Sequence, residues 1–508
     1  MIFQRNSQKP IAVTVFALLL LATGLRLFRL DNQSFWTDEV SSIINARAPL
    51  DKISEISATL NNCPPTYFFV LRPIIGESNQ RIEFNARLLS ALSGSLSIPL
   101  FIGVVWFWRK RWDTALVAGL ALAVNPLHIW YSQEVRAYAL MLLFGLGALL
   151  SFELAFSGRR SIWWLMYFIF ALAAMGTHKT GLAFALFCAA RQGLDFVRRR
   201  QNLIAFCTHL VVLLAAGILL SLRTYPPTKE YGRPSSVLEM AYTAMTFVGG
   251  YSFGPSLTDI QSHGPVAAVS RHLAQVVILG VVLALFGIAY LRWFRVAFLS
   301  NENGLLSLGV GLVIVGSIVS HFPFNVRYAL PALFGFLGLL ATLVTRCGKG
   351  SKDVANSECG TLPERQRENR KVLPWFGFLL GCAVLIISLW SDVQWYFGKN
   401  YRKGDSRAVA QWLAEHQNEI KSWTVLPEYL AISIQWYLEP YPELRSHCLP
   451  PKEPQFTSFP PVPDVLVLGR RHHVPQAEQI INSYNLAAPR IETVRTFAGF
   501  ELYVRRNQ

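Results

Sequence analysis

The sequence predicts an all-α, polytopic membrane protein with about eleven transmembrane helices and a small extracytoplasmic α/β domain near the C-terminus. Of its 508 residues, 52% are hydrophobic and only 15% are charged, whereas charged residues make up about a quarter of a typical soluble domain. Long apolar runs recur from the N-terminal region to Trp390, as expected of helices that cross a bilayer in succession. Basic residues cluster in every second loop between these runs, which is the pattern that the positive-inside rule produces.

The first apolar run, Ile11–Leu30, is long enough to cross a bilayer core, which takes about 20 residues. It has no small-residue cleavage site and further apolar runs follow, so we interpret it as a retained anchor and not as a signal peptide. The other expected spans are Arg87–Trp108, Thr114–Trp130, Ala137–Phe156, Ile162–Gly176, Thr180–Ala190, Leu203–Leu222, Leu273–Leu291, Gly304–His321, Tyr328–Thr345 and Val372–Trp390.

The distribution of basic residues predicts the orientation of these spans. The strongly basic loops are 109–111, 159–160, 191–200, 292–295 and 346–371. The alternate turns carry mostly single cations, namely Arg136, Lys179 and Arg327. This alternation places the N-terminus in the cytoplasm and the C-terminus outside it. It also accounts for the net charge of +16, so we expect no nucleic-acid partner.

Two long loops and a terminal domain are expected on the extracytoplasmic side of the transmembrane domain, residues 1–391. The apolar stretch Thr66–Gly76 is too short to cross, and a crossing there would invert every later loop. We therefore predict a juxtamembrane helix at this point, within an external loop 31–86. A second external loop spans 223–271.

The composition changes after Trp390, and residues 392–508 are expected to form the α/β domain. Its predicted elements are helices at Ser406–Gln417 and Pro475–Tyr484 and strands at Trp423–Leu426, Asp464–Leu468 and Phe500–Val504. The segment Tyr396–Lys403 joins it to the membrane domain. No motif within it carries chemistry, so we expect it to cover the membrane site or to recognise a partner.

Ionisable residues gather at the predicted external ends of the spans. The stretch Phe35–Val40 places two adjacent carboxylates directly after the first span, and the others are His128, Glu134, Arg136, His178, Lys179, His321 and Arg327. Each also fits a structural role, since arginines snorkel, histidines satisfy interfacial hydrogen bonds, and acids pair locally. Their occurrence on one side favours a functional site, because ionisable residues at the edge of a membrane are costly.

The residue types suggest a chemistry for this site. A carboxylate can act as a general base toward a hydroxyl or amine, and arginine binds phosphate and stabilises charge on a phosphate leaving group. An interfacial position suits a lipid phosphate. The seven cysteines show no CxxC spacing, so we expect no metal or redox centre. Only Cys63 and Cys448 fall outside the cytoplasm, and a disulfide between them remains open.

Several stretches resemble the motifs of one family of membrane enzymes. They are Trp36-Thr37-Asp38-Glu39, Pro64-Pro65-Thr66-Tyr67-Phe68, Ala86–Leu92, Asn125–Leu140, Thr177-His178-Lys179-Thr180-Gly181 and Val326–Pro331. In this order they resemble bacterial GT-C type glycosyltransferases, in the superfamily of the protein O-mannosyltransferases and the lipid A aminoarabinose transferase. The resemblance is strong over residues 10–190, thinner to 345 and faint beyond.

The resemblance implies a GT-C architecture and the transfer of a sugar, with inversion, from a polyprenyl-phosphate donor to a lipid, glycan or protein acceptor outside the cytoplasm. It implies a bacterial inner membrane as the location. The roles that it implies are Asp38 as general base with Glu39 in support, Glu134 in the sugar site, Arg136, Lys179 and Arg327 on the donor phosphate, and His128, His178 and Tyr138 in support.

Two features of the family bear on these roles. Cys63 stands where many relatives have histidine before Pro64-Pro65, so any role of that imidazole is missing here. Relatives of the oligosaccharyltransferase type use a divalent metal on such acids, whereas the mannosyltransferase-like members do not require it, and we expect no metal.

Two other functions remain open at this stage. A transporter or flippase of lipid-linked sugars would more often show repeated halves and charges at the membrane midplane, neither of which is visible here. A non-catalytic membrane subunit that binds a partner through its C-terminal domain would have no need of the carboxylates.

Overall fold

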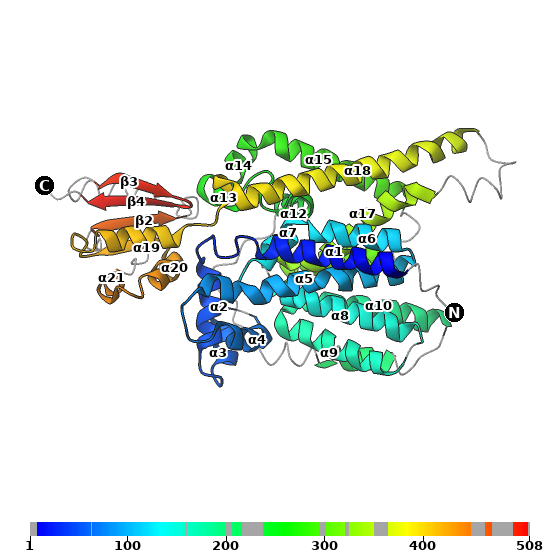
Figure 1. The fold of residues 1–508 in the computed structure, drawn as a ribbon, viewed down its shortest axis with the longest axis horizontal. Coiled ribbons are helices and arrows are strands. Elements are labelled where there is room, and N and C mark those ends of the chain that lie inside the picture. The colour runs from blue at the N-terminus through cyan, green and yellow to red at the C-terminus, as the bar shows by residue number, and fades with distance from the viewer. Residues whose placement is uncertain are drawn as a thin grey trace.

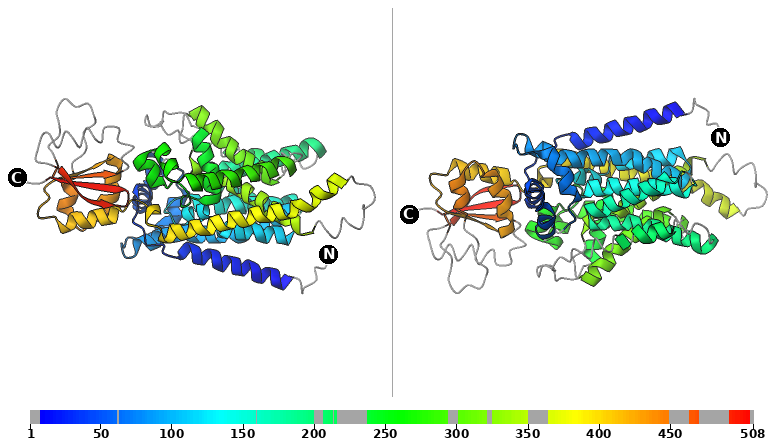
Figure 2. Two further views of the ribbon diagram at one scale, coloured as in Figure 1. Left: turned by 90° about the horizontal axis from the view of Figure 1, so that it is seen from above. Right: turned by 90° about the horizontal axis from the view of Figure 1, so that it is seen from below.

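The structure is a computed structural model (Figure 1). It describes residues 8–61, 63–158, 160–199, 206–212, 214–215, 237–293, 301–320, 325–349, 364–448, 463–469 and 491–505. The larger part is a bundle of long helices that run roughly side by side. A small sheet domain follows at one end of the bundle (Figure 2). The predicted helix Pro475–Tyr484 and most of the predicted span Leu203–Leu222 lie outside the described residues.

Six described helices are long and apolar enough to cross a membrane. Five of them are or lie within α1 (Gln8–Leu27), α5 (Ile82–Arg109), α8 (Tyr138–Phe156), α15 (Leu273–Trp293) and α18 (Glu364–Phe397). The sixth, Val326–Thr345, joins the 3-10 helix Val326–Ala329 to α17 (Leu330–Lys349). Further helices in predicted spans are α9 (Ile162–Thr177), α10 (Leu182–Arg199) and α16 (Asn301–Ser320). A multi-pass helical membrane protein is thereby confirmed, while the count of eleven spans stays a prediction.

The predicted span Thr114–Trp130 is not one straight helix. It consists of α6 (Trp112–Ala123) and α7 (Pro126–Ser132), which are bent by 57° relative to each other. The break follows from Asn125 and Pro126: the asparagine side chain caps α7 by accepting a hydrogen bond from the His128 amide at 3.0 Å, and proline lacks the amide that would continue α6. The bend directs the end of α7 toward the predicted external loop 31–86.

Three short helices lie between α1 and α5, in the predicted external loop 31–86. They are α2 (Thr37–Arg47), α3 (Ile53–Thr59) and α4 (Thr66–Ile75), the last at the predicted juxtamembrane position. Together with the start of α5 they enclose their own apolar core, which includes Phe35, Ile43 and Phe68. Arg72 donates hydrogen bonds to the Ala46 and Ala48 carbonyls. The short helices therefore form a packed layer at the end of the bundle, visible beside α5 in Figure 1.

The second predicted external loop is helical in its described part. It contains α12 (Val237–Gly249), α13 (Leu257–His263) and α14 (Pro265–Arg271). The end of α12 is buried in the main core, where the Asn125 side chain donates to the Phe247 carbonyl at 2.9 Å. Gly250 follows with a positive φ of 57° and packs against Pro126, where a larger side chain would not fit. This loop thus supports the bend between α6 and α7.

The C-terminal part contains a four-stranded sheet in the order β1-β2-β4-β3. The strands are β1 (Trp423–Leu426), β2 (Val465–Gly469), β3 (Ile491–Phe497) and β4 (Phe500–Arg505), with β1 and β2 parallel and the other pairs antiparallel. The helices α19 (Ser406–Glu415), α20 (Ala431–Tyr437) and α21 (Pro442–Ser446) pack with it around an apolar core that includes Trp423. This part of the chain therefore contains a small sheet with helices, and β3 was not among the predicted strands.

The sheet domain sits at the end of the bundle that also carries α2, α3, α4, α13 and α14, and the described N-terminal end of α1 lies at the opposite end (Figures 1 and 2). Hydrogen bonds join the sheet domain to this end of the bundle. The Phe35 amide donates to the Tyr437 hydroxyl at 2.7 Å, and the Asn79 side chain donates to Glu439 at 2.6 Å. The segments that the charge pattern assigned to one face thus meet at one end of the molecule.

Candidate functional site

The first turn of α2 sets the two adjacent carboxylates in different directions. Trp36 is the N-cap residue, and its amide donates to the Glu39 carboxylate at 3.4 Å in a capping-box arrangement. Glu39 therefore turns back under the helix start and is fully buried, whereas the Asp38 side chain remains 31% exposed. Acidic residues are favourable in the first turn because the helix dipole is positive there.

Glu39 belongs to a buried ion-pair cluster. Arg87, from α5, binds it with two parallel contacts, Nε to Oε1 at 2.8 Å and Nη2 to Oε2 at 2.9 Å. The Val135 amide donates to the same carboxylate at 3.1 Å. Burial alone would raise the pKa of Glu39, but Arg87 and Lys403 outweigh it and lower the pKa to about 2. Glu39 is thus held as an anion.

The second half of this cluster is Glu134, in the turn between α7 and α8. Lys403 Nζ lies 2.8 Å from Glu134 Oε1 and 3.7 Å from Glu39 Oε2. The Trp130 indole also donates to Glu134, at 2.8 Å. Burial raises the pKa of Glu134, with Lys403 acting in the opposite direction. We call Glu39, Arg87, Glu134 and Lys403 the buried cluster.

Asp38 faces a second group of charges, which we call the open cluster: Asp38, Arg136 and Arg327. Asp38 Oδ2 lies 3.4 Å from Arg327 Nη1 and 3.6 Å from Arg136 Nη2. These contacts are longer than the bidentate pair of the buried cluster. The two arginine side chains are 25% and 11% exposed. This carboxylate and its guanidinium partners are therefore accessible from outside the protein.

The open cluster has unused hydrogen-bond donors. The Nε atoms of Arg136 and Arg327 are buried and make no hydrogen bond to another described residue. Buried donors are normally paired, because leaving one unpaired costs about 1–3 kcal/mol. Two guanidinium groups with spare donors beside one carboxylate form a site that can accept an additional anion.

Aromatic rings and one histidine form the wall behind these arginines. The Tyr138 ring lies 5.8 Å from the Arg136 guanidinium carbon, and Tyr328 lies 5.3 Å from that of Arg327. The His178 ring packs on Tyr138, and its Nδ1 is 2.8 Å from the Thr180 hydroxyl. Burial first, and then the neighbouring cations, lower the pKa of His178 to about 3, so its imidazole is neutral. His178 and Tyr138 thus lie beside the arginines of the open cluster.

Lys179 follows His178 in the short 3-10 helix Lys179–Gly181. Its partial burial lowers the pKa of its ammonium group, and the nearby Cys63 acts in the opposite direction. Cys63 is buried, and neither it nor Cys448 is disulfide-bonded. The disulfide that the sequence left open is therefore not formed.

His128 does not join either cluster. It lies in α7, where its Nδ1 is 2.8 Å from Arg26 Nη2. Arg26 also donates to the Ala123 carbonyl at 3.0 Å and to the Leu122 carbonyl at 3.2 Å, both at the end of α6. His128 therefore supports the bend between α6 and α7. The sequence alone grouped it with the residues of the site, because position in the chain does not distinguish these two roles.

The sequence analysis missed two residues that hold the site together, Arg87 and Lys403. Arg87 lies within the motif stretch Ala86–Leu92, and a cation at the start of an apolar span is a signal of a buried partner. Lys403 lies in the basic segment that leads to the C-terminal domain, and its partners are hundreds of residues away in the chain. No local pattern indicates that pairing.

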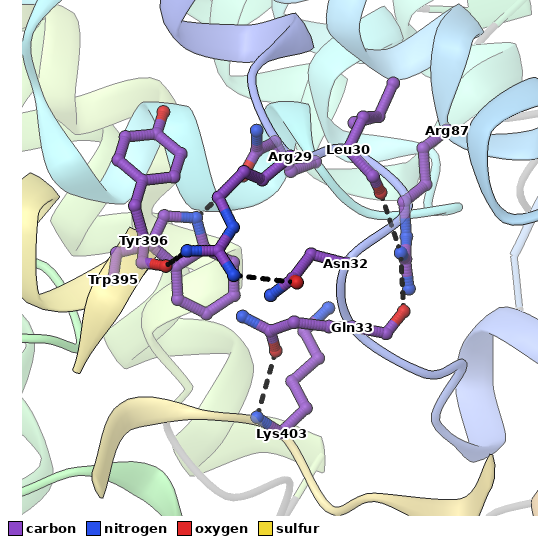
Figure 3. A pocket seen from close by; sticks show the side chains of 9 residues that line it. Arg29, Leu30, Asn32, Gln33, Arg87, Trp395, Tyr396 and Lys403 are labelled. Atoms are coloured by element: carbon purple, nitrogen blue, oxygen red, sulfur yellow. Dashed lines mark hydrogen bonds between the residues drawn. The ribbon is translucent and has the colours of Figure 1, made fainter. Parts of the chain in front are cut away.

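A small pocket lies between these two residues (Figure 3). It is lined by the segment that follows α1 and by the end of α18, together with Arg87, Gln133 and Lys403. Arg29 links two parts of this lining, because it donates to the Tyr396 carbonyl of α18 and to the Asn32 side chain, both at 2.8 Å. A second pocket lies beside Trp36 and Thr37, closed on its other side by Ser406, Ser433 and Phe500 of the C-terminal part.

The acids do not form a set of metal ligands. Each carboxylate already faces cationic side chains: Asp38 faces two arginines, Glu39 faces Arg87, and Glu134 faces Lys403. Within the described residues, no three side chains of the His, Cys, Asp or Glu types are grouped as a metal site would require. We therefore derive no chemical step through a metal.

The fold and the site together define a class: a multi-pass helical membrane protein with an accessible acid–arginine cluster at one end, under a small α/β domain. No protein-family model matches the chain, and no curated protein matches it. Among solved structures, it is similar to ArnT from Cupriavidus metallidurans bound to undecaprenyl phosphate, with a TM-score of 0.51 and 14% sequence identity over 97% of this chain and 99% of that one.

Two other structures are similar at lower scores. Apo ArnT from the same organism has a TM-score of 0.47, 14% identity and coverage of 99% and 100% of the two chains. The archaeal oligosaccharyltransferase AglB from Archaeoglobus fulgidus, in complex with an inhibitory peptide and a dolichol-phosphate, has a TM-score of 0.46 and 11% identity. This match covers 89% of our chain and 62% of AglB. The likeness to ArnT over nearly the whole chain confirms the resemblance to GT-C type glycosyltransferases at the level of the fold.

Proposed function

We propose that this protein transfers a sugar from a polyprenyl-phosphate donor to an acceptor at the membrane surface, and that the open cluster is the reaction site. The observation that carries this proposal is the pair of arginines around Asp38, each with a buried Nε that has no hydrogen-bond partner in the described part of the chain. The fold supports it, since ArnT of the same fold was solved with undecaprenyl phosphate bound.

In this proposal the donor phosphate binds to Arg136 and Arg327. Guanidinium groups bind phosphate through directed, charge-assisted hydrogen bonds, and the spare Nε donors are suited to that role. The same contacts stabilise the negative charge that develops on the phosphate as it leaves the sugar. Lys179, at the edge of this region, adds a further cation for the phosphate.

Asp38 is the general base. It accepts the proton of the acceptor hydroxyl or amine, the acceptor atom bonds to the anomeric carbon, and the bond from that carbon to the phosphate oxygen breaks. Attack opposite the leaving phosphate inverts the anomeric configuration. In the structure Asp38 pairs with both arginines, so a bound phosphate would take its place as their partner and free the carboxylate to accept the proton.

Glu39 and Glu134 have a supporting role in this proposal. Both are almost fully buried and already paired with cations, and Glu39 in particular is a weak base, with a pKa of about 2. They hold the start of α2 against the turn between α7 and α8. We further propose that the site faces the extracytoplasmic side of a bacterial inner membrane, with the C-terminal domain (residues 392–508) covering it.

The test is a transfer assay with the purified protein in vesicles. A panel of polyprenyl-phosphate sugars is supplied with lipid, glycan and peptide acceptors, and the release of free polyprenyl phosphate is followed. We expect Asp38→Asn to reduce turnover by at least about 100-fold, the usual contribution of a general base. Asp51→Asn is the matched control, because Asp51 is an exposed aspartate in the same loop.

Wild-type turnover in Asp38→Asn would remove the general-base role. If no donor is consumed by the wild type but a labelled donor crosses the vesicle membrane intact, the protein is a transporter of lipid-linked sugars. If neither transfer nor transport occurs with any donor, the transferase proposal is wrong and a partner-binding role remains.

A further inference from the structure

Lys403 is a buried lysine that comes from outside the membrane bundle. It lies in the segment between α18 and α19, and its side chain is only 7% exposed. Lysine is almost never buried to this degree unless it is paired, because a desolvated ammonium group is costly. Its partners are the two buried carboxylates, Glu134 at 2.8 Å and Glu39 at 3.7 Å.

Both the backbone around Lys403 and its ammonium group make contacts that hold the residue in place. Its amide donates to Gln33 Oε1 at 3.0 Å, and the Ser34 hydroxyl donates to the next carbonyl, that of Gly404, at 3.0 Å. Figure 3 shows the contact with Gln33. The ammonium group lies 5.2 Å from the centre of the Trp130 ring and 5.8 Å from that of Trp36, distances at which a cation is attracted to an aromatic face.

The charges of the buried cluster balance only if Lys403 is included. Two carboxylates, Glu39 and Glu134, face two cations, Arg87 and Lys403. Arg87 uses both of its contacts on Glu39. Removing the lysine would leave a buried carboxylate without its nearest cation, beside a second carboxylate of the same charge.

We propose that Lys403 is a positioning residue of the candidate site, and that through it the segment leading to the C-terminal domain is part of that site. Its ammonium group joins the start of α2, which carries Asp38, to the turn that carries Glu134 and Arg136. The open cluster is thereby held at its working spacing. The expected effect on transfer rests on the proposed function, whereas the ion-pair role does not.

The segment also connects Lys403 to the sheet domain. Two residues further on, the Asp405 amide donates to the Ala498 carbonyl at 2.8 Å, in the turn between β3 and β4. The Asp405 carboxylate caps α19 by accepting from the Ala408 amide at 3.1 Å. The domain and the buried carboxylates are therefore joined through a few residues of extended chain.

The first experiment compares three variants in the transfer assay. Lys403→Met keeps the length of the side chain and removes the charge, and we expect turnover to fall about 10- to 100-fold, as misplacement of reacting groups produces. Lys403→Arg keeps the charge and should restore much of the turnover. Lys399→Met is the control, because Lys399 is an exposed lysine of the same segment.

The second experiment does not require activity and measures Tm against pH. The charged groups that face Glu134 are Lys403, Glu39 and Arg136, with the tyrosines 131 and 251 nearby. Without the lysine, Glu134 in the folded state would hold its proton to a higher pH than in the unfolded chain, so folding would weaken as pH rises. The Tm deficit of Lys403→Met should therefore be larger at pH 8 than at pH 5.5.

The double variant Glu134→Gln/Lys403→Met should lose this pH dependence, because the carboxylate is no longer present. A Tm deficit that is the same at both pH values, or that Lys399→Met reproduces, would overturn the ion-pair role. Full turnover in Lys403→Met would overturn the positioning role. If the wild type transfers nothing, the proposed function fails, while the Tm measurement still decides the role of Lys403 in the buried cluster.

Discussion

The buried cluster and the open cluster begin at neighbouring residues, Glu39 and Asp38, yet their environments differ. The buried cluster starts at Glu39 and is closed to solvent, and its shortest contacts are the bidentate Arg87–Glu39 pair and the Lys403–Glu134 pair, at 2.8–2.9 Å. The open cluster starts at Asp38, has contacts of 3.4 and 3.6 Å, and contains two Nε donors without a hydrogen-bond partner among the described residues. Burial and short ion-pair contacts suit a support, whereas longer contacts and exposure to solvent suit a site where charges exchange partners.

The largest effect should come from breaking the buried cluster. Arg87→Leu would leave Glu39 buried without its bidentate partner, and loss of one member of a buried ion pair typically costs about 3–5 kcal/mol. We expect a strongly reduced Tm and a reduced yield of monodisperse protein. Arg402→Leu, at an exposed arginine, is the control. An unchanged Tm in Arg87→Leu would show that the cluster does not support the fold.

Acid should weaken the same cluster. The folded-state pKa of Glu39 is lowered from 4.5 to about 2, so its stabilisation is complete above about pH 4.5 and is lost as pH falls toward 2. The interval between these values corresponds to roughly 3 kcal/mol. In Glu39→Gln this acid-dependent loss of Tm should be smaller than in the wild type. Equal acid sensitivity of the two proteins would contradict the assignment.

A substitution in the open cluster should change the binding of the donor more than it changes the stability of the fold. Arg327→Gln removes one charged donor to the phosphate, and hydrogen bonds to charged groups contribute about 1.5–3 kcal/mol. We expect the KM for the donor to rise about 10- to 100-fold, with little change in Tm because the side chain is a quarter exposed. Donor titration and a thermal scan measure the two effects. A large fall in Tm without a change in KM would show that Arg327 stabilises the fold and does not bind the donor phosphate.

The smallest effect is expected at His128, which belongs to neither cluster. His128→Gln alters its contact with Arg26 at the helix bend, and loss of one hydrogen bond costs about 1 kcal/mol. Turnover per folded molecule should stay within about twofold of the wild type. A loss of turnover as large as that of Asp38→Asn would show that His128 takes part in the reaction.

Much of the architecture could be predicted from the sequence because it depends on local patterns. Apolar run length located the spans around α5, α8, α15 and α17, and β-branched and aromatic alternation located β1 with its observed bounds. Strand β3 was missed because its sequence contains Glu492 and Arg495, and it forms only through pairing with β4. The bend between α6 and α7 could have been read from Asn125-Pro126.

By itself the sequence determined that the chain is a multi-pass helical membrane protein, that an acidic pair begins α2, and that basic and acidic residues share one end of the bundle. Only the tertiary structure decided which of the two neighbouring carboxylates is accessible. That depends on Arg87 and Lys403, which reach Glu39 from elsewhere in the chain. The physical reason is that helix and strand periodicity are local, whereas burial and the pairing of buried charges are set by contacts between distant segments.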